Sequence, residues 1–207
     1  MFEKAREYLP IFQAHLKRRS TILGFTSGLP WYELAEPLIN RGSLFSPTES
    51  SSLLVDSIKK FDHKMGCFYE KAVNSRWIDF LTRKGKTGGV LCTNVTMISE
   101  NIIHLNFGGT ISDIRVMGHE LGHAYHSWLL DDYLLIFRDP PTPPCKISSI
   151  FNEIIFQESL IETELDNDRA VLIDSCTIDN VHKMVEKYSR LLFEDKLIEH
   201  RMDHELS

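Results

Sequence analysis

Apolar residues along most of the chain recur at intervals of three and four positions, which is the spacing of a helix that buries one face. The clearest run covers about residues 113–130, a second covers about 144–165, and a third extends from Ile178 to about Met202. This periodicity predicts a mainly helical protein. In the first run the predicted buried face consists of Ile114, Met117, Leu121, Ala124 and Trp128.

Signals for the beginnings of helices support this prediction. Ser46 is a candidate N-cap, Pro47 fits the first helical position, and Glu49 follows the cap by three residues, as in a capping box. Either Ser112 or Asp113 is expected to cap the helix of the first run. These two helices should therefore begin close to residues 47 and 113.

The connection before the second run is rich in proline. Four prolines lie between Asp139 and Lys146, so we expect an extended segment there. Pro143 and Pro144 can occupy the first positions of the helix that follows, because proline at that point loses no helical hydrogen bond.

The helical period is interrupted between about residues 76 and 107. VLCTNV, at 90–95, and IIHLNF, at 102–107, are short and rich in branched or aromatic residues, as short strands are. The stretch 76–89 contains glycines and basic residues, and we expect a loop that leads into this small sheet. Its GKT sequence is not interpreted as a phosphate-binding loop, because Phe80 stands where that motif requires glycine.

Composition narrows the class of protein. A chain of 207 residues, 43% of them apolar, can bury one sizeable core, and we treat it as one domain over 1–207. The net charge of −6 without a long basic run argues against a nucleic-acid partner, and no apolar stretch approaches the roughly 20 residues of a membrane-spanning helix. The four cysteines form no CxxC pair, which argues against a disulfide framework. We expect a cytoplasmic protein.

The motif HELGH, within the run 113–130, carries the strongest chemical signal. His119 and His123 are four residues apart, so a helix places their β-carbons about 5–6 Å apart on one face. Both rings can then direct a nitrogen at one zinc ion, about 2.0–2.1 Å from each. Glu120 lies beside such an ion and can take the proton of a zinc-bound water. The motif therefore predicts two metal ligands and a general base.

Chance occurrence of the motif is a competing interpretation. A pattern of three fixed positions can arise by chance in a chain with nine histidines, although Gly122 costs about 1 kcal/mol of helix propensity and suggests that something packs closely there. His126 also lies on the ligand face of the helix.

A third imidazole from one helix rarely completes the tetrahedron of zinc ligands. We therefore expect His126 to lie beside the metal or on the surface, and not to bind the metal.

With HELGH placed after IIHLNFGGTISDIRVM and before DPPTPPCKISSIFNE, the sequence resembles the oligoendopeptidase F branch of the thimet oligopeptidase-like zinc peptidases. LPWYELAEPL, NSRWIDFLTRKGKTGGVLC and SSIFNEIIFQESLIE extend the resemblance over nearly all of the chain. It implies a mainly α, zincin-like metallopeptidase catalytic domain, with a small β-sheet segment before the HExxH helix. It further implies one Zn²⁺, oligopeptide substrates, and a strand at about 102–107 that lines the substrate and could accept it as an added strand.

One residue departs from the family pattern. The family's third metal ligand is a glutamate, and the matching position here is Lys146. A protonated amine repels a metal ion and offers no lone pair, so we expect zinc to be weakly bound. Glu153 stands seven residues later, about 10 Å along a helix axis. Either Glu153 replaces the missing ligand or, as we favour, it is a partner of a zinc-binding histidine.

Length is the second departure. Family members continue past both ends of this sequence, and a later segment supplies oxyanion donors, each of which commonly contributes about 10²–10³ in rate. The last helical run also reaches Ser207 without a closing signal. We therefore expect a partial catalytic domain, truncated at both ends, which a complementing chain could complete. The leading hypothesis is a zinc metalloendopeptidase impaired by Lys146 and truncation, and the alternative is an inactive remnant or peptide-binding fragment.

Overall fold

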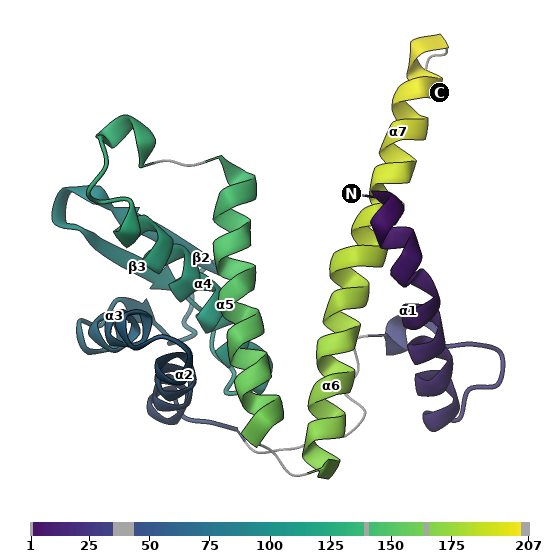
Figure 1. Cartoon of the computed structure of the whole chain (residues 1–207), viewed down its shortest axis with the longest axis horizontal. Helices are drawn as coiled ribbons and strands as arrows, with labels where there is room; N and C mark the ends of the chain where they lie inside the picture. The colour runs from purple at the N-terminus through teal and green to yellow at the C-terminus, as the bar shows by residue number, and fades with distance from the viewer. Residues whose placement is uncertain (1, 35–43, 139–140, 164–165, 204–207) are drawn as a thin grey trace. The chain divides into compact units, whose positions relative to one another are not determined.

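The computed structural model describes residues 2–34, 44–138, 141–163 and 166–203. The chain divides into two compact units, of which unit 1 comprises Met1–Asn40 with Leu165–Ser207 and unit 2 comprises Arg41–Glu164 (Figure 1). The HELGH motif lies in unit 2.

Helices dominate unit 2, which confirms the predicted mainly α fold class with a small sheet before the HELGH helix. Figure 1 shows α5 beside α4, with α2 and α3 at the same end of the unit. The elements in chain order are α2 (Pro47–Phe61), α3 (His63–Asn74), β1 (Ile78–Asp79), β2 (Leu91–Val95), the short turn Thr96–Ile98, β3 (Glu100–His104), α4 (Ile111–Leu129), η3 (Leu135–Phe137) and α5 (Thr142–Thr163).

The three strands form one sheet in the order β1-β3-β2. β3 is the central strand: Ile103 is in register with Ile78 of the parallel strand β1 and with Cys92 of the antiparallel strand β2. Both edges of β3 are paired at Ile103 and His104, so the prediction that a peptide adds along the strand at 102–107 is wrong. β2 is an edge strand of this sheet and lies on the opposite side of β3 from β1.

The core of unit 2 follows the predicted face of α4. Ile114, Met117, Leu121 and Ala124 are all 0% exposed, as the spacing predicted. Trp128, the fifth residue of that face, is only partly buried and stacks against Phe68 at a ring distance of 5.3 Å. The core of unit 2 also contains Leu54, Ile58, Tyr69, Ile103 and Leu105.

The helix beginnings were predicted with mixed success. Ser46 and Glu49 form the expected capping box of α2. α4 begins earlier than predicted, because Thr110 is its N-cap and Asp113 is the third helical residue of a second capping box. In that box the Asp113 carboxylate accepts the Thr110 backbone N–H at 2.9 Å.

α5 also begins earlier than expected. Its first residue is Thr142, and Pro143 and Pro144 lie in the first turn, where proline is tolerated. The prediction that Pro143 and Pro144 lie at the start of this helix is confirmed. The predicted extended connection is wrong from residue 142 onward, and residues 139–140 lie outside the described part of the chain.

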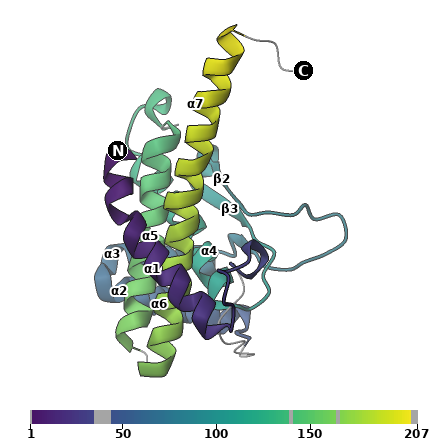
Figure 2. The same cartoon turned by 90° about the vertical axis from the view of Figure 1, so that its right-hand side faces the viewer.

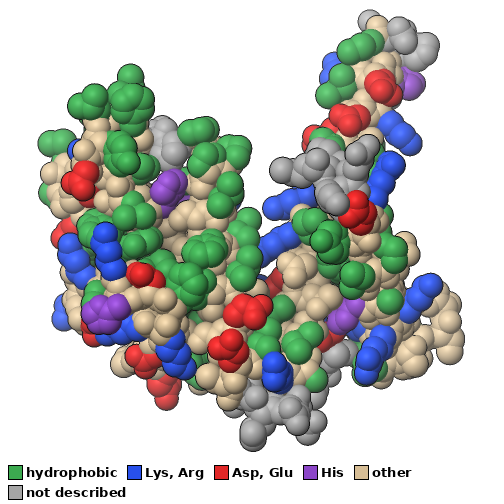
Figure 3. Space-filling view, viewed as in Figure 1, with side chains coloured by type: hydrophobic (Ala, Val, Ile, Leu, Met, Phe, Trp, Pro, Cys, Tyr) green, Lys and Arg blue, Asp and Glu red, His purple; other side chains and the backbone are tan. Residues whose placement is uncertain are grey.

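Exposed apolar side chains gather at one end of unit 2. The segment Leu134–Phe137 is 60–80% exposed, and Figure 3 shows hydrophobic side chains clustered at the end of the unit where η3 lies. A contiguous apolar patch of this kind is typical of a contact surface.

Unit 1 consists of a helix packed against a long helical segment (Figure 2). The predicted helix from Ile178 to Met202 is part of that segment, but the helical structure begins earlier and is interrupted by a π-helix. The elements are α1 (Phe2–Ile22), the turn Trp31–Glu33, α6 (Asp166–Asn180), the π-helix η4 (Val181–Glu186) and α7 (Lys187–Asp203).

A buried charge pair lies inside unit 1. Arg19 is 2% exposed and bonds to the carboxylate of Asp174, which is 6% exposed and also lies 3.0 Å from His15 Nε2. Compensation of this kind is what allows a guanidinium to be buried. Among the described helices, none has both the length and the apolar character needed to cross a bilayer.

Candidate functional site

Gly122 allows α4 and α5 to approach closely. A β-carbon at this position would lie 2.9 Å from Asn152 Nδ2, closer than real β-carbons are found, and 3.0 Å from Ser149 Cα, which is tighter than nearly all real contacts. Ser148 Oγ also donates a hydrogen bond to the Gly122 carbonyl at 3.1 Å. The glycine that weakens the helix by propensity thus permits the contact between helices on which the site depends.

A buried polar contact fixes how α5 lies on α4. The Tyr69 hydroxyl lies 2.5 Å from Asn152 Oδ1 and 3.3 Å from the Gly118 carbonyl, and Asn152 Nδ2 donates to the Ser148 carbonyl at 2.9 Å. Burial raises the pKa of Tyr69 well above its ordinary value, so the hydroxyl keeps its proton and donates it. These bonds hold the register that brings residues of α5 to the histidines of α4.

The two motif histidines lie together on α4 as predicted from their spacing. Their ring centroids are 4.9 Å apart, with the ring planes at 79° to each other. His119 Nδ1 bonds to the carboxylate of Glu153, which is only 6% exposed. With Nδ1 donating to Glu153, His119 Nε2 is left as the acceptor nitrogen of the ring.

Lys146 lies at this acceptor nitrogen. Its Nζ atom is 3.5 Å from His119 Nε2, on the side of the ring from which a metal ion would approach. The ring of His119 is therefore held between the Glu153 carboxylate and the Lys146 ammonium. The structure brings the predicted third-ligand position to the histidines, but with a cation in it.

Glu120 lies at the junction of α4 and the sheet. It is 8% exposed, and burial raises the pKa of its carboxyl, although the nearby His119 and Lys146 and the Cys92 backbone N–H, which donates to it, act in the opposite direction. A carboxyl with a raised pKa is suited to general acid–base work near neutral pH. The Cys92 contact places this carboxyl at the outer edge of β2.

His123 has a neighbour that sequence reasoning did not find. Cys145 Sγ lies 3.7 Å from His123 Nδ1. Burial, together with His119, Lys146 and His126, lowers the pKa of His123 to about 4, so its ring is neutral at pH 7. Cys145 immediately precedes the third-ligand position, and that adjacency was the only sequence signal for it.

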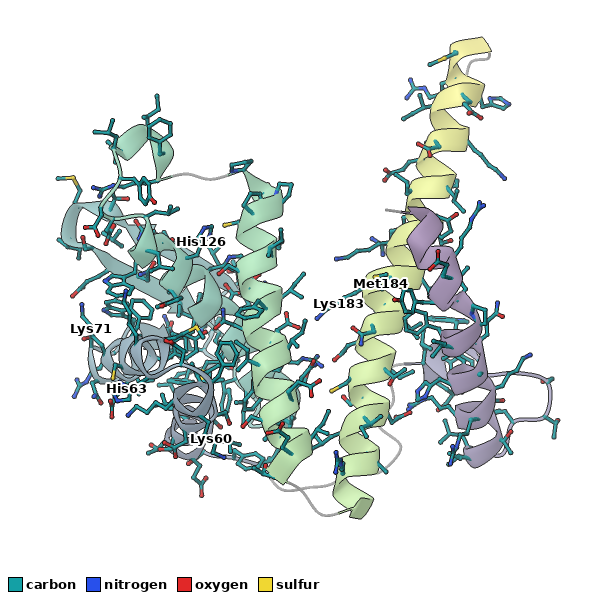
Figure 4. All side chains as sticks on the ribbon, in the orientation of Figure 1. Lys60, His63, Lys71, His126, Lys183 and Met184 are labelled. Atoms are coloured by element: carbon teal, nitrogen blue, oxygen red, sulfur yellow. The ribbon has the colours of Figure 1, made fainter. Side chains whose placement is uncertain are left out.

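His126 lies one turn beyond His123 on α4 and is labelled in Figure 4. Burial lowers its pKa. It does not join the motif histidines in a metal-type cluster within the described residues, where no group of three or more His, Cys, Asp or Glu side chains is placed to hold an ion.

The donor set therefore does not fit the zinc site that the resemblance implies. A catalytic zinc takes three protein ligands, and His119 and His123 supply two imidazole nitrogens. Glu153 bonds to His119 Nδ1, the nitrogen that would face away from a metal bound at Nε2. Glu153 is therefore placed to orient His119 rather than to bind the metal as a third ligand. Lys146, at the remaining position, brings a positive charge.

The outer face of the sheet carries a shallow cavity of about 500 Å³. It is lined by the loop before β2 and by side chains that alternate with the inward-facing ones of β2 and β3. Leu91 and Ile102, which contribute to the lining, are 60% and 57% exposed. This cavity lies on the opposite face of the sheet from Cys92, which contacts Glu120.

The thiols of unit 2 should differ sharply in reactivity. Burial raises the pKa of Cys92 to about 12, whereas Cys67 is exposed on α3. At pH 8 we expect iodoacetamide to modify Cys67 at least about 100-fold faster than Cys92, because the thiolate is the reacting species. Peptide mapping by mass spectrometry over time measures both rates, and equal rates would show that β2 is not packed on α4.

The family model of Peptidase family M3 matches residues 47–195 of the chain. The chromosomal oligoendopeptidase F of Lactococcus lactis subsp. cremoris is 26% identical over 207 residues, which cover 99% of this chain and 34% of that protein. An oligoendopeptidase F homologue of Mycoplasma pneumoniae is 29% identical over 164 residues, covering 75% of this chain and 26% of the homologue.

Solved structures show the same fold. A Chlamydophila abortus protein, described only provisionally as a peptidase, matches 97% of this chain with a TM-score of 0.81 at 16% identity, and the match covers 34% of that protein. PZ peptidase A, solved with an inhibitor, matches 86% of this chain with a TM-score of 0.58 at 21% identity, over 33% of its own length. The chain thus spans about a third of the length of the relatives it matches.

Proposed function

We propose that this chain, which belongs to Peptidase family M3, is an oligopeptide-binding peptidase unit in which metal-dependent hydrolysis is impaired by Lys146. The family and the curated relatives are peptidases, which supports oligopeptides as the ligands of the site. The observation that carries the proposal is the 3.5 Å contact between Lys146 Nζ and His119 Nε2.

The proposed roles follow from the donor set. In this proposal His119 and His123 would be the two remaining ligands of one weakly held Zn²⁺, which would activate a water molecule, and Glu120 would be the general base. Two imidazoles form half of a tetrahedral cage, and the adjacent ammonium repels a divalent cation. Zinc occupancy is therefore low under ordinary conditions, and hydrolysis is slow for that reason.

A peptide would bind along the outer edge of β2 in this proposal. Ile103 donates its N–H to the Trp77 carbonyl on the β1 side, so Cys92, its partner in register, directs its backbone groups away from β3. The Cys92 backbone N–H donates a hydrogen bond to the Glu120 carboxylate. An extended peptide added at this edge passes beside the Glu120 carboxyl, with alternate side chains facing the outer cavity near Leu91.

A second candidate is a unit that binds peptides without cleaving them. The cation beside His119 favours it, because without metal the site retains a buried carboxyl and the outer edge of β2 but lacks an electrophile. In both candidates the protein is cytoplasmic, as the sequence predicts.

Elemental analysis and a cleavage assay test the proposal. We expect the purified chain to hold far less than one zinc per molecule and to cleave a quenched fluorescent oligopeptide slowly, with all cleavage lost on adding a chelator. Glu120→Gln, which keeps the shape of the side chain, should abolish cleavage and keep binding of a labelled peptide in fluorescence anisotropy.

The outcomes separate the candidates. Chelator-resistant binding without any cleavage favours the non-catalytic unit. Stoichiometric zinc with rapid cleavage would contradict the impairment, and a chain that neither binds nor cleaves oligopeptides would contradict both candidates.

A further inference from the structure

The lysine of the GKT sequence is buried at the loop 80–90, which joins β1 to β2. Only 1% of the Lys86 side chain is exposed. Its Nζ atom donates hydrogen bonds to the carbonyls of Asp79 at 2.9 Å, Leu81 at 2.9 Å and Leu105 at 2.8 Å. An ammonium carries three protons, so this one has a carbonyl partner for each of them. Lys86 therefore ties the loop to the last residue of β1 and to the residue that follows β3.

The later part of the same loop is fastened to the segment around the end of β3. His104 Nε2 donates to the Thr87 carbonyl at 3.1 Å. Asn106 Nδ2 donates to that carbonyl at 3.0 Å and to the Gly89 carbonyl at 3.4 Å. Gly85 and Gly89 have φ angles of +86° and +95°, a conformation that favours glycine, so the chain can turn at both ends of this segment. The loop is thus held at two places.

The burial of Lys86 needs a physical reason. Removing an ammonium from water is costly unless hydrogen bonds and an opposite charge compensate it. The Asp79 carboxylate lies 3.4 Å from Lys86 Nζ and supplies that charge. A neutral side chain in place of Lys86 would leave three carbonyls without this donor, and the loop would lose its attachment to β1 and β3. The buried cation therefore fixes where the loop lies.

The fastened loop forms one side of the outer cavity of about 500 Å³. Residues 87–90 of the loop line the cavity together with Leu91, Thr93, Ile102 and His104 of the two strands. Among these described lining residues, none is an aspartate, glutamate, lysine or arginine. A cavity of this size can hold one side chain of a peptide. Its lining gives a charged side chain no partner of opposite charge, and it removes an apolar side chain from water.

We propose that Lys86 is a positioning residue for peptide specificity. By fastening the loop 80–90 it shapes the outer cavity into a subsite that takes an apolar side chain of the bound peptide. The inference rests on the proposed function, because it takes the outer edge of β2 as the place where the peptide adds. Leu91 and Thr93 face the cavity, and every second side chain of an added strand lies beside them on that face. The peptide main chain bonds to the edge whatever its sequence, whereas the cavity distinguishes side chains.

Fluorescence anisotropy on the full chain tests the proposal, with a chelator present to prevent cleavage. The probes are three short, labelled, alanine-rich peptides with leucine, alanine or glutamate at one position. We expect the wild type to bind the leucine peptide at least about tenfold more tightly than the other two. Lys86→Met should lower this ratio to about threefold or less and change the affinity for the alanine peptide by less than about twofold.

Two variants separate positioning from a general loss of structure. Lys86→Arg keeps a cation with several donors and should retain at least about fivefold preference for the leucine peptide. Lys84→Met is the matched control, because Lys84 is exposed in the same loop, and it should keep the wild-type ratio. A purely structural role for Lys86 would lower the affinities for all three peptides together and leave their ratio unchanged.

Hydrogen exchange measures the loop without any peptide. In Lys86→Met the amides of residues 87–90 should exchange at least about tenfold faster than in the wild type. The Ile103 N–H, which bonds to the Trp77 carbonyl at 2.8 Å in the sheet, should keep its rate. If Lys86→Met does not fold, Ile102→Lys still tests the subsite. Ile102 is 57% exposed and lines the cavity, so a cation there should reverse the preference in favour of the glutamate peptide.

The outcomes are distinct. A folded Lys86→Met protein with the wild-type ratio would overturn the inference, and so would an Ile102→Lys protein that still prefers the leucine peptide. Equal affinity of the wild type for all three peptides would overturn this inference alone and leave the proposed function standing. A chain that binds none of the peptides would overturn both.

Discussion

Lys146→Glu is expected to raise the affinity of the chain for zinc at least tenfold, a gain of about 1.4 kcal/mol or more in binding free energy. The substitution removes a positive charge 3.5 Å from His119 Nε2 and supplies an anionic oxygen at the same position of α5. Competition with a chromophoric zinc chelator measures the change. Chelator-sensitive cleavage of a fluorescent oligopeptide should increase in parallel.

Two control variants separate ligation from charge. Lys146→Gln removes the cation without supplying a carboxylate, so it should gain less zinc affinity than Lys146→Glu. Lys84→Glu makes the same change of charge in an exposed loop and should leave affinity unaltered. Equal affinity in Lys146→Glu and the wild type would show that Lys146 does not occupy the third-ligand position.

Gly122→Val is expected to destabilise the chain by about 3 kcal/mol and to lower its melting temperature by about 6–12 °C. The β-carbon would lie 3.0 Å from Ser149 Cα, which belongs to the backbone of α5 and cannot rotate away. The helices would have to separate, and the bond between His119 and Glu153 would be lost with them. Differential scanning calorimetry measures the loss.

Gly88→Val is the matched control for this prediction. Gly88 lies in the loop before β2, and nothing lies within 4 Å of the point that a β-carbon would occupy, so the same substitution meets open space there. Its melting temperature should stay within about 1 °C of the wild type. An equally stable Gly122→Val protein would mean that α4 and α5 are not in close contact at this glycine.

Local features of the fold were predictable because their causes are local. The capping box at Ser46 depends on residues three positions apart, and the buried face of α4 depends on apolar spacing within one helix. The N-cap of α4 was misplaced for a related reason: Thr110, Ser112 and Asp113 are all good caps, and the sequence does not say which of them accepts the third backbone N–H.

Long-range features were not predictable from one sequence. Residues 78–79 looked like part of a loop, yet they pair with β3 and turn it into the central strand of the sheet. That pairing closes the edge to which a peptide was expected to add. The π-helix between α6 and α7 likewise has no periodic signal that distinguishes it from the α-helix on either side.

The candidate site was only partly predictable. The helical spacing brought His119 and His123 together, and the family resemblance marked Lys146 and Glu153 as positions near them. The contacts of Cys145 with His123 and of the Cys92 N–H with Glu120 join segments far apart in sequence, so spacing could not reveal them.

α5 shows how a site overrides the hydrophobic pattern. Ile147, Phe151 and Ile154 are 70%, 48% and 48% exposed, whereas Asn152 and Glu153 are nearly fully buried. The polar face packs on α4 because its hydrogen bonds to Tyr69 and His119 compensate for the burial of polar groups. A helix selected for stability would be expected to bury its isoleucines instead.

A crystal structure of the full chain grown with excess Zn²⁺, with data collected at the zinc absorption edge, tests most directly whether Lys146 takes the place of the metal. We predict at most a weak anomalous peak, from partial zinc occupancy, between His119 and His123, and density for Lys146 Nζ within hydrogen-bonding distance of His119 Nε2. A fully occupied zinc ion bound by both histidines, with the Lys146 side chain turned away from them, would contradict this claim.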